Sequence, residues 1–362
     1  MSKIKIITFD QAIKKSAAYN KRHLLVGNGF SIACVPDIFT YRSLFEKANF
    51  RNMPEVKELF KTFQTHDFEL VINALEQSSL TLPAYGKQFV KIAKKMQEHA
   101  GKLKEILIKT IAENHPAYPA TISDNKYEAC ARFLSLFMNS ENGGCIYTIN
   151  YDLLLYWTVM FGKNKELFDI LPNDGFGRDT DFEDGESHVS QYVTWQGETS
   201  AHGQNIHYLH GALHVFDNGN EVEKYTWIDT GIRLIDQTRA ALEQNKFPLF
   251  VAEGESKKKM EKILHNGYLY HSYKSFSKIM EKGSRVSDCL FTYGVSFSDN
   301  DNHIFKKIYK GHIRKLFVGL YGDPDSEANK VIISKIEYLK SKRKASDLEV
   351  EYYDAESAKV WG

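Results

Sequence analysis

Six short apolar runs, rich in β-branched and aromatic side chains, recur along the chain and constrain its fold more than any other feature. Most are almost continuously hydrophobic, as strands are when helices cover both faces of a sheet. Helical patterns separate them, so the sequence predicts an α/β fold with a doubly wound, mostly parallel sheet of the Rossmann type and helical insertions. The six runs are HLLVG at His23–Gly27, CIYTI at Cys145–Ile149, IHYLH at Ile206–His210, CLFTYG at Cys289–Gly294, KLFVGLYG at Lys315–Gly322 and LEVEYYDA at Leu348–Ala355.

The spacing of these runs predicts a single domain over residues 1–362 with three insertions. More than a hundred mostly helical residues separate the first two runs, which is too many for one crossover, so a helical insertion is expected at about 33–141. Within it, apolar residues recur every three or four positions over Gly86–Glu113 and predict an amphipathic helix packed on the core. A loop-rich insertion is expected at about 162–204 and a small helical one at about 247–282.

Composition excludes several classes of protein. The 362 residues carry 47 Lys and Arg against 46 Asp and Glu, so the net charge of +1 indicates neither a nucleic-acid nor a membrane partner. The longest apolar run, Leu153–Phe161, is far below the roughly 18 residues of a membrane span. The opening MSKIKIITFDQ lacks the apolar core of a signal peptide, so a cytoplasmic protein is expected. No two of the 4 cysteines form a C-x-x-C pair, which excludes a cysteine zinc ribbon.

The first run ends in a glycine motif, GNGFS at Gly27–Ser31, placed before a helical pattern. Glycines at such a turn let the backbone approach a ligand closely and aim amide groups at a phosphate. The full G-x-G-x-x-G fingerprint is absent, because Ile32 stands where the third glycine would fall. By itself the motif indicates either a phosphate-binding loop or a tight structural turn.

Polar residues also follow the second and fourth runs. Asn150 and Asp152 come directly after the second run, at the strand end where open α/β sheets bind ligands. Each also fits an Asx turn or the N-cap of the next helix. In TYGVSFSDNDNHIF, Gly294 and Ser296 end the fourth run, and the acidic residues at 299–301 fit a helix cap equally well.

The third run ends in His210 and Gly211, which predicts a histidine at the same edge of the sheet. A histidine titrates near neutrality and is suited to general-base work. A metal site made of His207, His210 and His214 is disfavoured, because a glycine turn separates the last two and no carboxylate is near in sequence. No metal is therefore expected.

In this order, GNGFS, TINYD, LHG and YGVSFSDND resemble the motif set of the sirtuin-like NAD-binding family. The resemblance is to the bacterial sirtuin-like proteins of anti-phage defence and to a related prokaryotic family of unknown function, and it extends from Leu24 to about Phe305. The sirtuin motif G-A-G-x-S is matched by Gly27, Gly29 and Ser31, N-x-D by Asn150 and Asp152, H-G by His210 and Gly211, and G-T-S by Gly294 and Ser296.

Two departures from the sirtuin pattern bear on the activity. Sirtuin deacylases have a glutamine just before the motif asparagine, where this chain has Ile149, and they carry a four-cysteine zinc module that it lacks. The resemblance therefore speaks against protein deacylation. It implies an NAD glycohydrolase that cleaves NAD to nicotinamide and ADP-ribose, as the defence relatives do, with NAD as substrate and no zinc.

The resemblance also implies roles for single residues, expected as follows. Asn150 binds the ribose hydroxyls or the attacking water, His210 is the general base or accepts a ribose hydroxyl, and Asp152 orients the nicotinamide ribose or amide. The residues expected to bind the pyrophosphate are Gly27, Asn28, Gly29, Phe30 and Ser31, and those expected to bind the adenosine side are Gly294 and Ser296. Further contacts with NAD are expected from Thr148, Tyr151, Gly211 and Asp299.

Two other functions remain open at this point. A sirtuin-like module could sense NAD or a related nucleotide without cleaving it, although pure binding needs neither Asn150 nor His210. A transferase of ADP-ribosyl or acyl-lysine groups would need a cleft for a macromolecular acceptor. Because an unrestrained NADase would kill the cell, regulation through homo-oligomers or a separate sensor protein encoded nearby is expected.

Overall fold

In the part of the chain that the structure describes, the main sheet has seven strands. The computed structural model describes residues 4–177, 192–197, 203–226, 233–281, 288–343 and 348–362. Neighbouring strands of the described sheet are all parallel, which confirms the expected α/β class, and six of the strands fall on the six apolar runs. In spatial order the strands are β1 (Ile6–Ile7), β11 (Glu349–Asp354), β10 (Lys315–Leu320), β9 (Cys289–Tyr293), β2 (Arg22–Val26), β3 (Gly143–Thr148) and β6 (Ile206–Tyr208).

The strand order reverses at β2. After β2 the chain adds β3 and β6 on one side, and then returns to place β9, β10 and β11 on the other. The carboxyl ends of β2 and β9 therefore flank the switch point, where open α/β sheets bind their ligands in a crevice.

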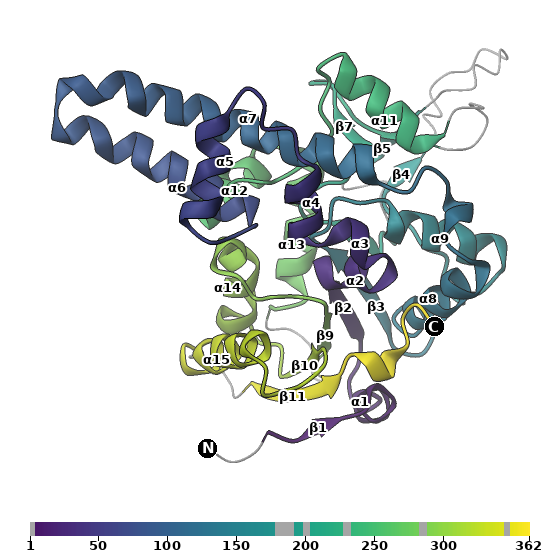
Figure 1. The fold of residues 1–362 in the computed structure, drawn as a ribbon. Helices are drawn as coiled ribbons and strands as arrows, with labels where there is room; N and C mark the ends of the chain where they lie inside the picture. Colours follow the sequence, from purple (N-terminus) through teal and green to yellow (C-terminus); the bar gives the residue numbers. More distant parts are fainter. Residues whose placement is uncertain (1–3, 178–191, 198–202, 227–232, 282–287, 344–347) are drawn as a thin grey trace, which may run out of the picture.

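Helices cover both faces of this sheet (Figure 1). Phe291 pairs with Leu24 and Tyr147 pairs with the next residue, Leu25, so the two rings point to opposite faces. A phenylalanine of α1 lies 6.1 Å from the Phe291 ring, and Phe276 of α13 lies 5.0 Å from the Tyr147 ring. This double cover explains why the strands are apolar throughout.

The α-helices have the following bounds: α1 (Phe9–Ser16), α2 (Asn28–Cys34), α3 (Pro36–Phe39), α4 (Tyr41–Lys47), α5 (Pro54–Thr62), α6 (Phe68–Thr81), α7 (Val90–Asn114), α8 (Asp124–Ser135), α9 (Leu154–Asn164), α11 (Leu234–Glu243), α12 (Ser256–Leu264), α13 (Gly267–Lys278), α14 (Asn302–Lys310) and α15 (Glu327–Ser341). Short 3₁₀ turns lie at Leu82–Tyr85, Lys87–Phe89, Pro119–Thr121, Asp299–Asp301 and Glu356–Ala358.

Helices α2 to α8 occupy the chain between β2 and β3, and α6 and α7 form a long pair that projects from the body of the protein (Figure 1). The apolar stripe predicted over Gly86–Glu113 packs on the core from Met96 onward. Leu103 and Leu107 of α7 are buried, whereas Ile92 is 51% exposed. The prediction was wrong at Ile92, which lies toward the end of α7 that projects from the body with α6 (Figure 1).

The described part of the chain also forms a second, antiparallel sheet. Its strands are β4 (Phe176–Gly177), β5 (Tyr192–Trp195), β8 (Val222–Tyr225) and β7 (Val215–Asp217), in that order. The segment predicted as a loop-rich insertion, 162–204, contributes β4 and β5, but its residues 178–191 and 198–202 lie outside the described part of the chain. The segment predicted at 247–282 contributes α12 and α13, and residue 282 again lies outside.

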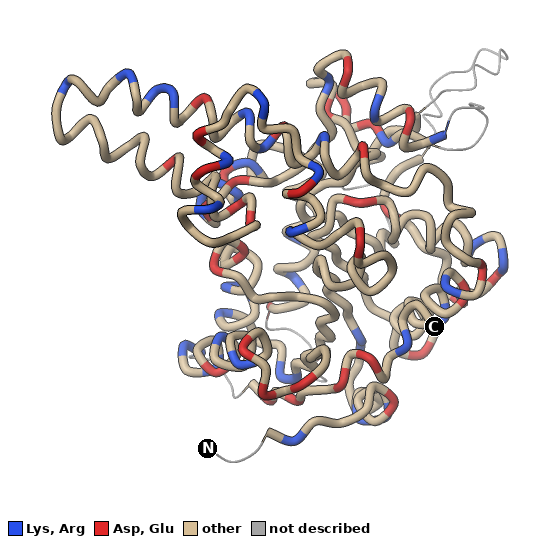
Figure 2. The backbone as a smooth tube through the Cα atoms, in the orientation of Figure 1, with Lys and Arg blue, Asp and Glu red and all other residues tan. Residues whose placement is uncertain are grey.

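Charges of both signs alternate along the outer helices, while the strands at the centre of the main sheet are largely uncharged (Figure 2). Among the described helices, none combines the length and the apolar character that crossing a membrane requires.

Candidate functional site

A cavity of about 560 Å³ opens at the carboxyl ends of the central strands, at the switch point of the sheet. Its volume is in the range of small-molecule and cofactor sites. Residues after β2, β3, β6 and β9 line it, and α4, α6, α12 and α15 close it from the outside. Two groups of residues form and support its wall, and they differ in chemistry.

The first group, the glycine cluster, consists of Gly27, Gly29, Gly294, Ser31 and Asn150. The amides of Gly27 and Gly29 donate 3.0 Å hydrogen bonds to the carbonyls of Tyr293 and Gly294, which joins the loops after β2 and β9. A Cβ on Gly29 would lie 2.5 Å from the Gly294 Cα, and Gly294 has a φ of +65°. Glycine is therefore required for the close approach of the two loops, and both amides are already satisfied within the protein.

Asn150 holds this cluster together from the end of β3. Its Nδ2 donates to the Gly27 carbonyl at 3.0 Å and to Ser31 Oγ at 2.9 Å. The Ser31 hydroxyl in turn donates to Asp152 Oδ2 at 2.5 Å, and Asp152 Oδ1 accepts the Leu154 amide at 2.9 Å. Burial raises the pKa of Asp152. Asp152 thus forms an Asx turn at the start of α9, as one of its sequence interpretations expected, and it also anchors the cluster through Ser31.

His210 projects into the cavity wall from the turn after β6. The side chain is almost fully buried, and its Nε2 lies 3.0 Å from His303 Nε2 and 3.9 Å from Asp301 Oδ1. Burial lowers its pKa well below the ordinary value, and it lowers the pKa of His303 to about 4. Both imidazoles are therefore neutral near pH 7.

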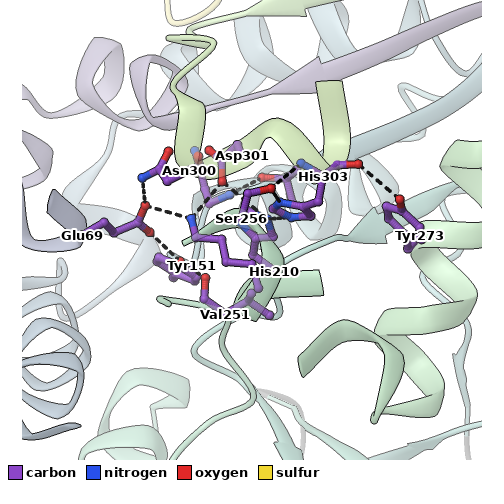
Figure 3. A network of polar contacts seen from close by, with 12 residues as sticks. Glu69, Tyr151, His210, Val251, Ser256, Tyr273, Asn300, Asp301 and His303 are labelled. Carbon is purple, nitrogen blue, oxygen red and sulfur yellow. Dashed lines mark hydrogen bonds and ion pairs between the residues drawn. The ribbon is translucent and has the colours of Figure 1, made fainter. Parts of the chain in front are cut away.

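The second group, the acidic cluster, consists of Asp67, Glu69, Lys259 and Asp301. Glu69 and Asp301 are labelled in Figure 3. The buried ammonium of Lys259 lies 2.8 Å from Glu69 Oε2 and 2.8 Å from Asp301 Oδ1. Burial acts to raise the pKa of Asp301, but Lys259 outweighs it and holds that pKa at about 2. Burial raises the pKa of Glu69 to about 7.

Two neighbours complete the hydrogen bonding of Glu69. The amide of Asn300 donates to Glu69 Oε2, and the Tyr151 hydroxyl lies 3.3 Å from Glu69 Oε1 while it donates to the Val251 carbonyl at 2.6 Å (Figure 3). The acidic cluster is therefore built from α6, α12 and the loop after β9, which are far apart in the sequence.

Most of the site residues predicted from the sequence line this cavity, and four do not. Those in its wall are Gly27, Asn28, Gly29, Asn150, Tyr151, Asp152, His210, Gly294, Ser296 and Asp299. Those behind the wall are Phe30, Ser31, Thr148 and Gly211.

Each of these four has a structural role instead. Phe30 packs against Trp361, with ring centres 5.1 Å apart. Thr148 Oγ1 accepts a hydrogen bond from the backbone amide of Asn150. Ser31 bonds Asn150 and Asp152, as described above. Gly211 has a φ of +79°, and a Cβ there would lie 1.9 Å from the Leu249 carbonyl oxygen.

The sequence did not identify the acidic cluster. A lysine run such as Lys257–Lys259 is typical of a solvated helix face, but the Lys259 side chain is 1% exposed. The available signal was its position four residues before the buried Ile263, which places both on the inner face of α12.

Three side chains in the cavity wall and just behind it have the composition of a metal site. His210, Asp301 and His303 offer ligand atoms that lie within 4.8 Å of one another. The other two histidines weighed in the sequence lie elsewhere. His207 stacks on Tyr147 at 5.0 Å, and His214 packs against Tyr156 at 4.6 Å.

Fold and site together define an α/β protein with a ligand-sized cavity at the switch point of a parallel sheet. The chain belongs to a family described as a domain of unknown function, DUF4917, whose family model matches residues 24–361. No curated protein matches the sequence.

Among solved structures, the chain is similar to one titled as a crystal structure of a Sir2 homolog–NAD complex. The two share 11% identity over 94% of this chain and 96% of that chain, with a TM-score of 0.32. At this identity and TM-score, nothing about the site is inferred from that structure.

Proposed function

We propose that the protein is an NAD glycohydrolase that cleaves NAD to nicotinamide and ADP-ribose in the cavity at the switch point. The observation that supports this most is the convergence of all four motif-bearing strand ends on one cavity. Asn150 and His210 reach its wall from neighbouring strands β3 and β6. These motifs are the ones that resemble the sirtuin-like set.

The charge of the cavity wall suits the reaction. The nicotinamide of NAD is cationic and leaves as a neutral base, so the glycosidic bond breaks through an oxocarbenium-like transition state without strong acid catalysis. Asp67, Glu69 and Asp301 provide negative potential near His210, moderated by Lys259. We place the nicotinamide ribose toward this acidic cluster and the adenosine side toward Gly294 and Ser296.

The remaining roles follow from that placement. The loops of the glycine cluster hold the pyrophosphate, and Asn150 fixes these loops and contacts the ribose or the attacking water. Water adds its oxygen to the anomeric carbon, the bond to the nicotinamide nitrogen breaks, and one proton is released. His210 Nε2 accepts a hydrogen bond from a ribose hydroxyl, or it accepts this proton. Either role requires the substrate to replace His303 as the partner of Nε2.

Substitution of His210 tests the catalytic assignment. His210→Ala should lower turnover by about 10²- to 10⁴-fold, measured as equal amounts of nicotinamide and ADP-ribose released from NAD. The exposed His265, which is not in the cavity wall, provides the control His265→Ala. Wild-type turnover in His210→Ala would show that the role given to His210 is wrong.

A sensor that binds NAD without cleaving it is the second candidate. One observation favours it: Asn150 already uses both hydrogens of its amide within the protein, and His210 Nε2 already faces His303. A purified protein that binds NAD but releases no nicotinamide under any condition would support the sensor and exclude the hydrolase.

Regulation is part of the proposal. We place the enzyme as an effector of anti-phage defence that depletes NAD when triggered, restrained by its oligomeric state or by a separate sensor protein. Nicotinamide release should then depend on protein concentration or on a co-expressed genomic neighbour. Full activity of the isolated chain at all concentrations would contradict this part.

A further inference from the structure

His210, His303 and Asp301 converge on one point beside the cavity (Figure 3). His210 Nε2 lies 3.0 Å from His303 Nε2 and 3.9 Å from Asp301 Oδ1. Two ligands bound to one tetrahedral zinc ion at about 2.0–2.2 Å lie roughly 3.3 Å from each other. One of these separations is shorter than that value and the other is longer, and all three ligand atoms lie within 4.8 Å of one another, so side-chain movements would bring them onto a single ion.

The second nitrogen of each imidazole has a partner of the kind that orients metal-binding histidines. His303 Nδ1 lies 3.3 Å from Ser256 Oγ, and the His303 backbone amide donates to the same hydroxyl at 2.7 Å. The ring of His210 hydrogen-bonds the backbone at Ile149. The Ser256 hydroxyl can either accept a hydrogen bond from Nδ1–H of His303 or donate one to Nδ1. When it accepts, the hydrogen of the ring is on Nδ1, and the lone pair of Nε2 is available to an ion.

The simpler explanation of the 3.0 Å contact is a hydrogen bond in which one neutral imidazole donates to the other. That bond explains why the two imidazoles lie together, but it does not explain why the Asp301 carboxylate lies beside them. Asp301 also accepts from Lys259 at 2.8 Å, which competes with a bound cation. A carboxylate has about four lone-pair sites, and a hydrogen-bonded carboxylate is the usual state of a metal ligand, so both partners can be held together.

Protonation also favours ligation. Burial lowers the pKa of His303 to about 4 and that of His210 well below its ordinary value, and Lys259 holds the pKa of Asp301 at about 2 against its burial. Two neutral imidazoles and an ionised carboxylate are the forms that bind a metal, and one imidazole has only to change its tautomer, so that its hydrogen moves from Nε2 to Nδ1.

We propose that His210, His303 and Asp301 bind one divalent transition-metal ion, with zinc as the expected occupant. Two imidazoles and one carboxylate suit zinc, and a fourth position would remain open toward the cavity. The consequence for activity rests on the proposed function: a bound ion occupies the His210 nitrogen that hydrolysis of NAD requires. The metal would therefore hold the enzyme in an inactive state.

Direct metal binding tests the site independently of any activity. Chelator-treated full-length protein is titrated with Zn²⁺ by calorimetry, and with Co²⁺ while its visible absorption is recorded. We expect one ion per chain, with the intense bands of low-coordinate Co²⁺. In His303→Ala the high-affinity binding should be lost, while the control His265→Ala should bind as the wild type does. His303→Gln is a second variant that keeps the volume of the side chain.

The outcomes are distinguishable. No stoichiometric binding by the wild type, or binding that persists in both folded His303 variants, would overturn the metal site. If the wild type binds zinc and cleaves NAD, the zinc-loaded protein should lose at least about ten-fold in turnover, and a chelator should restore it. Cleavage unaffected by bound zinc would overturn the inhibition. If no NAD is cleaved, only the proposed function fails, because the titration still decides the metal site.

Discussion

The glycine cluster and the acidic cluster share one cavity but are stabilised in different ways. The first is neutral and is joined by short backbone and amide hydrogen bonds between strand ends. The second places the buried ammonium of Lys259, on α12, between one carboxylate from α6 and one from the loop after β9. The comparison teaches that the glycine cluster depends on backbone shape, whereas the acidic cluster depends on charge balance. Substitutions should therefore affect the two clusters by different mechanisms.

The largest effect is expected at Lys259. Lys259→Met leaves Glu69 and Asp301 buried without their cation, and breaking a buried ion pair in this way costs about 3–5 kcal/mol. The free energy of unfolding, measured with urea, should fall by that amount. The neighbouring Lys258 pairs with Glu76 and is 30% exposed, so Lys258→Met should cost below about 1 kcal/mol. Equal effects of the two substitutions would show that the acidic cluster does not depend on charge balance.

An intermediate effect is expected from pH, through Glu69. Because burial raises the pKa of Glu69 from 4.5 to about 7, the folded protein binds an extra proton between these values. The stability of the wild type relative to Glu69→Gln should be greatest below about pH 4.5 and should be lost as pH rises through 7. Each unit of pKa difference corresponds to about 1.4 kcal/mol. Thermal unfolding of both proteins from pH 4.5 to 8 measures this, and parallel curves would contradict it.

The smallest effect on stability is expected in the glycine cluster. In Gly29→Ala the new Cβ would meet the Gly294 backbone at 2.5 Å, and this overpacking should cost about 1–3 kcal/mol. NAD affinity should fall in the same variant, because the two loops must separate. Gly101 of α7 has open space around it, so Gly101→Ala should stabilise by roughly 0.5–1 kcal/mol. Unchanged NAD binding in Gly29→Ala would show that the contact between the two loops is not part of the NAD-binding site.

The difference between the two clusters also explains which parts of the site could be predicted from the sequence. Strand ends are local features, so the apolar runs placed Gly27, Asn150 and His210 at one edge of the sheet, where the structure has them. Whether a residue beside them faces the cavity depends on the twist of single turns. Phe30 and Thr148 were therefore expected at the ligand and lie behind the wall.

The acidic cluster could not be found in this way. Glu69 and Lys259 are 190 residues apart, and each lies on a helix whose own pattern explains it without a site. Only the tertiary fold brings them together, and burial then makes their charges consequential. Likewise, nothing in the sequence of its helix distinguishes His303, and only the tertiary fold places its Nε2 3.0 Å from that of His210.

The central claim is that the two clusters form one catalytic site for NAD, and nicotinamide release from NAD by the purified protein tests it most directly. Wild type, Asn150→Ala and Asn220→Ala are compared over a range of protein concentrations, with and without co-expressed neighbours. Asn220 is exposed and does not line the cavity, so it serves as the control. We predict release by the wild type and by Asn220→Ala, and a loss of about 10²- to 10⁴-fold in Asn150→Ala. Equal release by all three proteins, or no release by any under every condition, would contradict the account.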